Sequence, residues 1–395
     1  MKTVDSYNFS GKKALIRVDF NVPLNADFEI TDDSRMTAAL PTIQKILSDG
    51  GSVVLMSHLG RPKNGPEDKY SLKHLVSHLE KLTGVSVQFS QDCIGSEAVA
   101  ISEALAPGKI HLLENLRFHK EETAGDAAFA ALLARHGDIY VNDAFGTAHR
   151  AHASTAVVAE SFSDKYFGYL MAKEVANATK LMEAPERPFT AIVGGAKVSD
   201  KILIIENLLN IADHIIIGGG MAYTFSVAQG GSIGDSLFEE DRVQICANIL
   251  TRAAKKGVQI HLPADNICAN EFSNKANQQA CDSGEIPDGW MGLDIGVKAA
   301  KDFSNVLLAS KTILWNGPMG VFEMSSYENG TKSVADAVAQ STRNGAFSLI
   351  GGGDSSAAVK KFGYTNDVSY VSTGGGALLE FFEGKELPGI LAISN

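Results

Sequence analysis

The chain has 395 residues, of which 45% are hydrophobic and 21% charged, and its formal net charge is −11. This length allows two or three domains, the composition is that of folded rather than disordered proteins, and the negative charge opposes binding to nucleic acid. We see no signal peptide at the N-terminus and no apolar run near the roughly 20 residues that span a bilayer, so we expect a cytoplasmic protein without membrane contact.

Short apolar runs rich in Val, Ile and Leu alternate with segments of helical periodicity along the whole chain. Strands are predicted at 14–20, 52–57, 85–89, 109–114 and 138–142, and again at 189–194, 214–218, 258–262, 312–316, 347–351 and 368–372. Ser71 is expected to cap a helix that ends before Gly84, and Pro41 to lie in the first turn of a helix that stops before Gly50. The alternation predicts an α/β protein with parallel sheets and helices on both faces.

A helical pattern at 167–184, closed by Pro185 and Pro188, joins the two halves without a Gly/Ser-rich linker. We therefore predict a first domain at 1–166, a connecting helix and hinge at 167–185, and a second domain at 186–383. The apolar tail at 384–395 is expected to pack back on the first domain.

The four cysteines give no sign of a metal or redox motif. Cys93, Cys246, Cys268 and Cys281 are 153, 22 and 13 residues apart, with no CxxC pair and no neighbouring His at metal-ligand spacing. We interpret them as reduced and structural.

Cationic side chains are concentrated in the first half, where six of the ten Arg and eight of the ten His precede residue 153. Asp19 and Asn21 lie two apart at the end of a strand, so both point to one face and suit a sugar or glycerate hydroxyl. Arg and His side chains follow further strands (His58, Arg61, Arg117, His149, Arg150, His152), whereas Arg35 precedes a helix. Because ligands bind at the carboxyl ends of parallel strands, these loops should converge on an anion.

Each of these residues also has a simpler interpretation. A single arginine is most often a solvated surface charge, and His58, His149 and His152 fit a structural role as well as a ligand role. The neighbouring acids at 32–33 are most simply charges near a helix start rather than a metal site.

The second half contains 26 of the 38 glycines. Five glycine-bearing turns follow strands, at 193–201, 218–223, 315–323, 351–356 and 372–377, and backbone amides in such turns can bind phosphate. Such turns are also common wherever a strand leads into a helix. Lys197 and Lys201 are four apart and should share a helix face that reaches terminal phosphates. Asp354 either caps a helix or holds Mg²⁺, and Glu323 could bind ribose hydroxyls.

Neither GxGxxG nor GxxxxGK[ST] occurs in the chain. The absence of these motifs argues against a nicotinamide-dependent dehydrogenase and against a P-loop kinase.

The ordered motifs RVDFNVP, TDDSRM, SHLGRP, LENLRF, AHRAHAST, GGAKVSDK, WNGPMGVFE, GGGDSS and STGGGA span residues 17–377. Together they resemble the phosphoglycerate kinase family. The resemblance implies two Rossmann-like domains across a cleft, a monomer, and Mg²⁺-dependent transfer of phosphate between 1,3-bisphosphoglycerate and ADP, giving 3-phosphoglycerate and ATP. The departures are small: Ser34 and Met36 lie where the family commonly has Thr and Ile, and Ser355 lies where a Thr often follows the Asp. Ser355 keeps the hydroxyl and is expected to cap the helix.

The resemblance also implies roles for individual residues. Substrate binding is implied for Asp19, Phe20, Asn21, Arg35, His58, Leu59, Gly60, Arg61, Arg117 and Arg150. Nucleotide binding is implied for Lys201, Gly292, Asn316, Glu323, Gly352, Gly353, Asp354 and Ser355. The residues implied in catalysis are Arg35, Lys197 and Lys201, and Asp354 would hold the Mg²⁺.

The implied chemistry needs no general base, because the nucleophile in the ATP-consuming direction is a carboxylate that is already ionised at neutral pH. One alternative function is a non-enzymatic two-domain protein that closes on an anion. That alternative leaves Lys197, Lys201 and Asp354 without a role.

Overall fold

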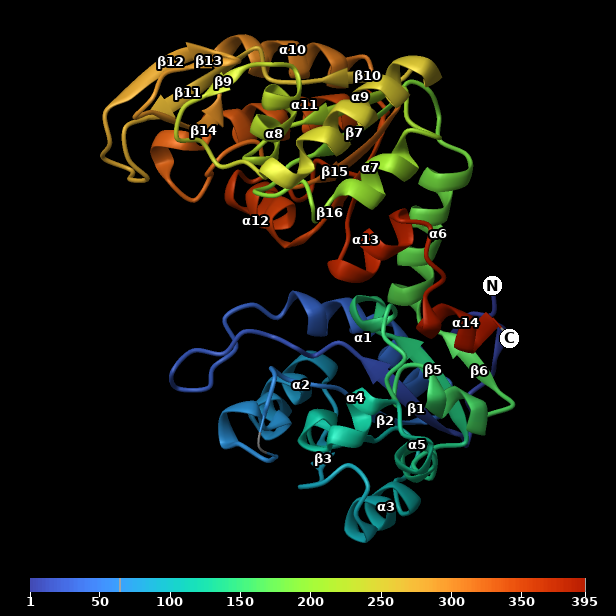
Figure 1. Ribbon diagram of the computed structural model, residues 1–395. Coiled ribbons are helices and arrows are strands. Elements are labelled where there is room, and N and C mark those ends of the chain that lie inside the picture. Colours follow the sequence, from blue (N-terminus) through green and yellow to red (C-terminus); the bar gives the residue numbers. More distant parts are fainter. Residues whose placement is uncertain (64, 395) are drawn as a thin grey trace. The chain divides into compact units, whose positions relative to one another are not determined.

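The computed structural model describes residues 1–63 and 65–394. The chain divides into two compact units (Figure 1): unit 1 comprises Met1–Ala176 and Glu386–Asn395, and unit 2 comprises Asn177–Lys385. The division falls inside α6 (Tyr169–Glu183), the helix predicted at 167–184. Each unit has its own six-stranded parallel sheet, which confirms the predicted α/β class.

The sheet of unit 1 has the strand order β3-β4-β2-β1-β5-β6. Its strands are β1 (Lys13–Val18), β2 (Ser52–Met56), β3 (Val87–Phe89), β4 (Ile110–Leu112), β5 (Ile139–Asp143) and β6 (Lys165–Phe167). The first five lie where the sequence predicts strands, and β6 was not predicted. After β1 the chain continues to β2, on one side of β1, and it later returns to β5 on the other side. The connections therefore diverge between β1 and β5. A ligand crevice is expected at the carboxyl ends of these two strands.

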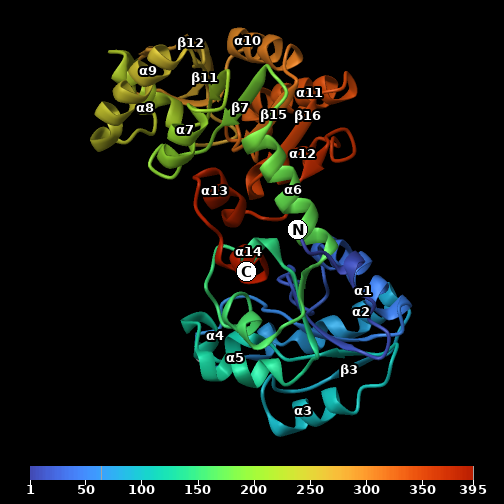
Figure 2. The same cartoon turned by 90° about the vertical axis from the view of Figure 1, so that its right-hand side faces the viewer.

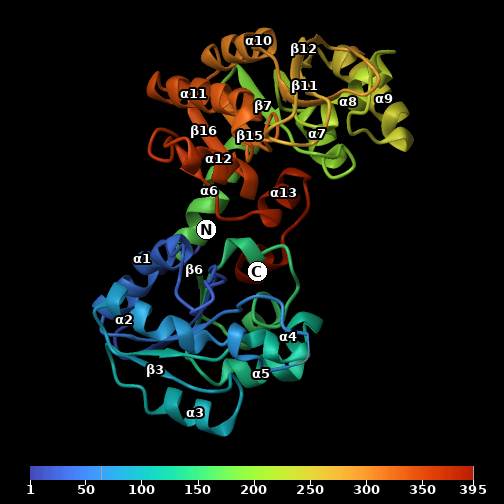
Figure 3. The same ribbon diagram turned by 90° about the vertical axis from the view of Figure 1, so that its left-hand side faces the viewer.

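Helices cover both faces of this sheet. They are α1 (Ser34–Ser48), α2 (Val76–Thr83), α3 (Ser96–Glu103), α4 (Lys120–Ala124) and α5 (Ala127–Ala134). Figures 2 and 3 both place α1 and α2 on one side of the sheet and α4 and α5 on the other. Alternate β1 residues such as Ile16 and Val18 pack with Ile43 of α1 in one core.

Pro41 lies in the middle of α1, not in the first turn as predicted. The helix begins before Pro41, at Ser34, because its apolar face from Met36 to Ile46 packs into the core. Pro41 itself is exposed, so tertiary packing keeps a helix that propensity alone would have started later. Ser71 is a cap as predicted, since its hydroxyl accepts from the Lys73 amide, but it caps a 3-10 helix at Leu72–Leu75, and the α-helix α2 begins only at Val76.

The main sheet of unit 2 has the order β10-β8-β7-β15-β16-β17, which is the dinucleotide-fold order 3-2-1-4-5-6. Its strands are β7 (Phe189–Val193), β8 (His214–Ile217), β10 (Gln259–His261), β15 (Thr312–Asn316), β16 (Phe347–Gly351) and β17 (Tyr370–Val371), all predicted. Its helices are α7 (Ile202–Leu208), α8 (Met221–Ala228), α9 (Val243–Lys256), α10 (Val297–Leu308), α11 (Asn329–Arg343), α12 (Gly353–Lys361) and α13 (Gly376–Phe382). In Figures 2 and 3, α7 to α9 lie on one side of this sheet and α10 to α12 on the other.

Unit 2 also contains short strands that the sequence did not predict. An antiparallel sheet is made of β12 (Gln278–Asp282), β11 (Asp265–Ala269) and β14 (Met291–Ile295), and β9 (Ser232–Ile233) pairs with β13 (Glu285–Ile286). These segments carry many polar residues and lack a long apolar run, so only their pairing identifies them as strands.

The end of the chain returns to unit 1 as α14 (Pro388–Ser394). The Gly389 amide donates to the Ala148 carbonyl at 2.8 Å, and Asn142 Nδ2 donates to the Gly389 carbonyl at 3.4 Å. The last residue of the predicted tail, Asn395, lies outside the described residues. Within residues 1–63 and 65–394, we find no helix with the length and hydrophobicity needed to cross a membrane.

Two buried histidines should make unit 1 sensitive to acid. Nδ1 of His111 and Nδ1 of His136 contact the Ser102 hydroxyl at 2.8 and 2.7 Å, and burial lowers the pKa of both imidazoles to about 4. An unfolded chain would take up these protons between pH 6.5 and 4, so stability should be complete above this range and fall through it, by on the order of 2–3 kcal/mol per histidine. Urea unfolding at pH 7 and pH 4.5 measures the effect.

The control is a His111→Gln, His136→Gln double variant. We expect it to be less stable at neutral pH but to lose less stability on acidification, because the glutamines do not titrate. An unchanged pH dependence in this variant would contradict the assignment.

Candidate active site

Loops after β1, β2 and β4 are tied together at Gly60. The Gly60 amide donates to Asn21 Oδ1 at 2.8 Å, and Arg117 Nη1 donates to the Gly60 carbonyl at 2.8 Å. Gly60 has φ +61, and a Cβ there would lie 2.3 Å from the ring of Tyr70. Only glycine fits this position. The structure therefore brings three of the predicted substrate residues into direct contact.

Arg35 and Asp19 form a second contact at this edge of the sheet. Arg35 Nη1 donates to Asp19 Oδ2 at 2.7 Å, where the Asp19 side chain is nearly buried and that of Arg35 is 39% exposed. Arg35 lies in the first turn of α1, not before a helix as predicted, because α1 begins at Ser34. The Asp19 carboxylate orients the Arg35 guanidinium, and part of the guanidinium still faces solvent.

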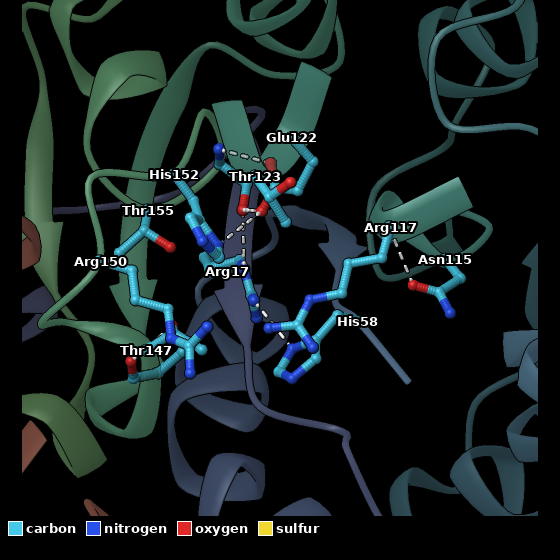
Figure 4. Close-up of polar contacts among 12 residues, drawn as sticks. Arg17, His58, Asn115, Arg117, Glu122, Thr123, Thr147, Arg150, His152 and Thr155 are labelled. Carbon is cyan, nitrogen blue, oxygen red and sulfur yellow. Dashed lines mark hydrogen bonds and ion pairs between the residues drawn. The ribbon is translucent and has the colours of Figure 1, made fainter. Parts of the chain in front are cut away.

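Arg17 is the main component of the site that the sequence did not predict. It lies within β1, is 1% exposed, and donates through Nε to Ser154 Oγ at 2.9 Å (Figure 4). Its Nη2 contacts Nδ1 of His58 at 3.1 Å. The sequence did contain a signal for Arg17, because it is a charged residue inside an otherwise apolar strand, and buried charges are rare without a partner.

The partner charge comes from Glu122, which is fully buried in α4. Its two carboxylate oxygens accept from the Ser154 hydroxyl at 2.6 Å and the Ser154 amide at 2.9 Å. Ser154 therefore links the Glu122 carboxylate to the Arg17 guanidinium. This link partly compensates the cost of a buried cation.

His58 is held as a neutral donor. Burial lowers its pKa well below 6.5, and the charges of Arg17, Arg117 and Arg35 act in the same direction. A guanidinium can only donate, so Nδ1 of His58 accepts from Arg17 and the imidazole proton resides on Nε2. His58 can therefore donate a hydrogen bond to a ligand, but it is a poor general base.

The remaining arginines share one cationic region of unit 1. A cavity of about 720 Å³ is lined by Arg61, Arg117 and Arg150 among others. Burial lowers the pKa of Arg117 to about 10, with further contributions from Arg17, Arg150 and Arg61. Mutual repulsion among these cations would be relieved by an anion, so the cluster is suited to a phosphorylated carboxylic acid.

Phe20 and Leu59, which the family resemblance also implied, have different surroundings. Both side chains are buried and pack into the core of unit 1. Their side chains are therefore not available to a ligand, and the Phe20 amide is also engaged within the protein, since it donates to Ser57 Oγ at 2.9 Å.

In unit 2, the glycine turns surround a cavity of about 520 Å³. Its walls include Gly195 and Gly219 from the turns after β7 and β8, together with Gly292, Glu323 and Asp354. The structure thus brings together three predicted nucleotide residues that are distant in the sequence. Apolar side chains also line it, as expected for a site that takes a planar base.

Lys197 and Lys201 do not share a helix face, so this prediction was wrong. Lys197 lies in the exposed loop after β7, and Lys201 precedes α7, which begins at Ile202. The amide and hydroxyl of Ser199, which lies between the two lysines, both donate to Glu239, 40 residues further along the chain. These long-range bonds replace the helical turn that the spacing suggested.

Asn316 positions Lys201. This asparagine, at the end of β15, is 2% exposed, donates to the Gly351 carbonyl at 2.8 Å and accepts from Lys201 Nζ. Burial lowers the pKa of Lys201, while the charges of Asp200 and Asp354 oppose this shift. The ammonium is thus held at the end of β15, within electrostatic range of Asp354.

The start of α12 differs from the predicted cap. Gly352 has φ +92, and a Cβ there would lie 2.8 Å from Asn316 Nδ2, which requires glycine. The Ser355 hydroxyl is buried and accepts from the Gly317 amide at 2.6 Å rather than capping the helix. Asp354 lies exposed in the first turn, where the positive end of the helix favours a carboxylate.

Gly292 has no room for a side chain, and this gives a test of the cavity. An added Cβ would lie 1.9 Å from Tyr223 Oη, and Tyr223 is 6% exposed. We expect Gly292→Ala to displace the Tyr223 ring into the cavity, raise KM for ATP several-fold and cost about 1–3 kcal/mol of stability. Steady-state kinetics in the ATP-consuming direction check this, with KM for 3-phosphoglycerate as the internal control. An unchanged KM for ATP would contradict it.

Folding also creates a group that cysteine spacing did not reveal. Ligand atoms of Asp92, Cys93 and His119 lie within 4.8 Å of one another and could hold a metal ion. His119 Nε2 already contacts Asp92 Oδ1 at 2.7 Å. This group is separate from Asp354, where the family resemblance places Mg²⁺.

Comparison with known proteins identifies the family. The family model described as phosphoglycerate kinase matches residues 4–385. Two similar relatives, named phosphoglycerate kinase, are from Porphyromonas gingivalis and Chloroherpeton thalassium. Both are 52% identical over 100% of this chain, covering 100% and 99% of the relatives. The solved phosphoglycerate kinase of Coxiella burnetii superposes with a TM-score of 0.90 at 40% identity, over 99% of this chain and 98% of that one.

The matches extend over both units and include the arginine cluster of unit 1 and the glycine turns of unit 2. The chain belongs to the phosphoglycerate kinase family, the transferases that phosphorylate the carboxyl group of 3-phosphoglycerate.

Proposed function

We propose that this protein catalyses the reversible, Mg²⁺-dependent transfer of a phosphoryl group between 1,3-bisphosphoglycerate and ADP, yielding 3-phosphoglycerate and ATP in glycolysis. The observation that carries the proposal is the convergence of five arginines on the carboxyl edge of the unit 1 sheet, in a chain of this family. Its cytoplasmic location and monomeric state remain predictions from the sequence.

The glycerate ligand is assigned to unit 1. Arg61, Arg117 and Arg150 would bind its phosphate, because they line one cavity and their planar forks match phosphate oxygens. The Asp19 carboxylate would accept a hydrogen bond from the hydroxyl group of the ligand, and the Asn21 amide would accept or donate one. His58, neutral and protonated on Nε2, would donate to an oxygen of the ligand.

The nucleotide is assigned to unit 2. Gly292 would line the base subsite, Glu323 would bind ribose hydroxyls, and the turn from Gly352 to Ser355 would present amides to the phosphates at the start of α12. Lys201 would bind a terminal phosphate from its position on Asn316. The cavity of about 520 Å³ provides the volume for this ligand.

Asp354 fits the proposed Mg²⁺ role. Its carboxylate is exposed, lines the cavity and lies near the Lys201 ammonium. A single carboxylate is sufficient, since Mg²⁺ usually combines one or two carboxylates with substrate phosphates and water. When bound, the ion would neutralise charge on the nucleotide phosphates.

No residue needs to remove a proton from the nucleophile. The acceptor is a carboxylate, ionised at neutral pH, so the barrier lies in alignment and charge repulsion. Arg35 and Lys197 would stabilise charge on the transferred PO₃ group, and direct in-line transfer follows from holding donor and acceptor in one geometry. The low pKa of His58 agrees with this absence of base catalysis.

The two ligands are assigned to different units, so transfer requires a closed state that also excludes water from the acyl phosphate. We propose α6 and the segment 383–391 as the hinges. Small-angle scattering should show compaction when MgADP and 3-phosphoglycerate are both present. An unchanged radius of gyration would contradict hinge closure.

The function is tested by mixing the protein with MgATP and 3-phosphoglycerate and measuring ADP. Release should depend on both substrates and on Mg²⁺. A non-enzymatic anion-binding protein would bind 3-phosphoglycerate without releasing ADP. ADP release that ignores 3-phosphoglycerate would indicate an ATPase and overturn the proposal.

A further inference from the structure

Two of the four free cysteines, Cys268 and Cys281, belong to one buried cluster in unit 2. Cys268 is on β11 and Cys281 on β12, and the antiparallel register pairs Cys268 with Gln279, two residues before Cys281. Since alternate residues of a strand share a face, both thiols point to the same side of the small sheet.

The pair belongs to a small apolar core. Cys268 and Cys281 pack with Tyr223, Ile233 and Ile286, and they are 0% and 9% exposed. Cys281 is the one buried residue of β12, whose pattern is otherwise exposed or intermediate. The more exposed thiol is therefore on an edge strand, and the enclosed thiol lies behind it on the central strand.

The same core borders the candidate nucleotide cavity. Cys268 pairs across the sheet with Gly292 of β14, and a register irregularity lies between Ile267 and Cys268. Tyr223 contacts the cysteine core on one side and lines the cavity beside Gly292 on the other. A change in the spacing of β11 and β12 would therefore be transmitted to the cavity wall.

We propose that Cys268 and Cys281 are a modification site, at which a hydroperoxide converts the dithiol to a reversible disulfide that weakens nucleotide binding. The disulfide itself follows from the cysteine geometry. Its effect on nucleotide binding rests on the function proposed above.

The chemistry balances in two steps. The Cys281 sulfur attacks one oxygen of hydrogen peroxide, the O–O bond breaks, and a sulfenic acid and one water form. The Cys268 sulfur then displaces hydroxide from the sulfenic sulfur, the S–S bond forms, and the second water leaves. Two sulfurs are oxidised, peroxide is reduced, and an external dithiol reverses the reaction.

Closure should move the strands slightly. Diagonal neighbours on paired antiparallel strands typically have Cα atoms about 7–8 Å apart, whereas disulfides usually need about 4.4–6.8 Å. Forming the bond would draw β11 and β12 together. Tyr223 and Gly292 are the cavity-lining residues next to the cysteines, so this strand movement would reach them first.

The test uses the full-length reduced protein, treated with hydrogen peroxide and then assayed with and without dithiothreitol. Thiol titration in denaturant should fall from four groups to two, and the peptide map should show Cys268 linked to Cys281. Calorimetric ADP affinity should fall several-fold and recover with dithiothreitol. Cys281→Ala should keep its remaining thiols and its ADP affinity under the same treatment.

Cys246→Ala is the matched control, because Cys246 is a buried thiol on α9 outside this core. It should still lose two thiols and ADP affinity on oxidation. Retention of all four thiols in the wild type, or equal sensitivity of Cys281→Ala, would overturn the disulfide. A Cys268–Cys281 disulfide that leaves ADP affinity unchanged would overturn the coupling to the cavity. If the reduced protein bound no ADP, the proposed function would fail instead, while the thiol count would still judge the disulfide.

Discussion

An Arg35→Ala enzyme is expected to lose kcat by about 10³-fold or more, because one arginine that stabilises a moving phosphoryl group can contribute about 10³–10⁵-fold in rate. KM for 3-phosphoglycerate should change much less. The reason is geometric: Arg35 is oriented by Asp19 at 2.7 Å, yet its side chain stays 39% exposed and does not form part of the core. Steady-state kinetics with both substrates varied measure the effect.

Two controls separate catalysis from folding in this experiment. Arg35→Lys keeps the charge but not the planar fork, so it should recover only part of the rate. Arg135→Ala removes an exposed arginine at the end of α5 and should leave kcat unchanged. An Arg35→Ala protein that is folded, as judged by its thermal transition, and turns over normally would refute the catalytic assignment.

The second large effect is expected for Lys201→Ala, which should raise KM for ATP at least tenfold and also lower kcat. The ammonium is held against Asn316, and burial already lowers its pKa, so the structure maintains a cation here at a cost. A bound phosphate would offset that cost because it adds negative charge beside the ammonium. Kinetics with varied ATP, together with calorimetric ADP binding, measure the two effects separately.

Lys197→Ala is the informative comparison. Lys197 lies exposed in the loop after β7 rather than against Asn316, and we assign it to the phosphoryl group in flight. Its loss should lower kcat more than nucleotide affinity, whereas Lys201→Ala should show the larger loss of affinity. Lys311→Ala, an exposed lysine before β15, should change neither quantity. Normal ATP affinity in Lys201→Ala would contradict its role as a phosphate ligand.

Sequence patterns predicted the elements that carry long apolar runs. All eleven predicted strands are present. The central ones, such as β2, β7 and β15, are buried along their whole length, which requires continuous Val, Ile and Leu. The short antiparallel sheet with β11 and β12 was missed, since its strands carry mixed polar residues and are defined by their partners. The start of α1 was also missed, because packing of Met36 and Ala39 overrides the preference for Pro41 near a helix start.

Predictions from local sequence spacing failed where a side chain hydrogen-bonds to a segment far along the chain. The spacing of Lys197 and Lys201 suggested a helix, but this loop is not helical and its Ser199 bonds to Glu239. Ser355 suggested a helix cap, but its hydroxyl binds the Gly317 amide. In both cases the deciding partner is far along the chain, so spacing alone carries no information about it.

The sequence by itself determined the fold class, the family, and the separation of cationic loops from glycine turns, because each depends on residue type, order and strand-end position. Only the tertiary structure decided that Arg17 is buried against His58 and supported through Ser154 by Glu122. It also decided that Cys268, which pairs with Gly292, shares a buried cluster and a sheet face with Cys281. These contacts join segments that lie far apart in the sequence, at separations unrelated to helix or strand periodicity. They exist because the sheet order places strand ends and strand faces side by side, and sheet order follows from packing of the whole unit rather than from any local pattern.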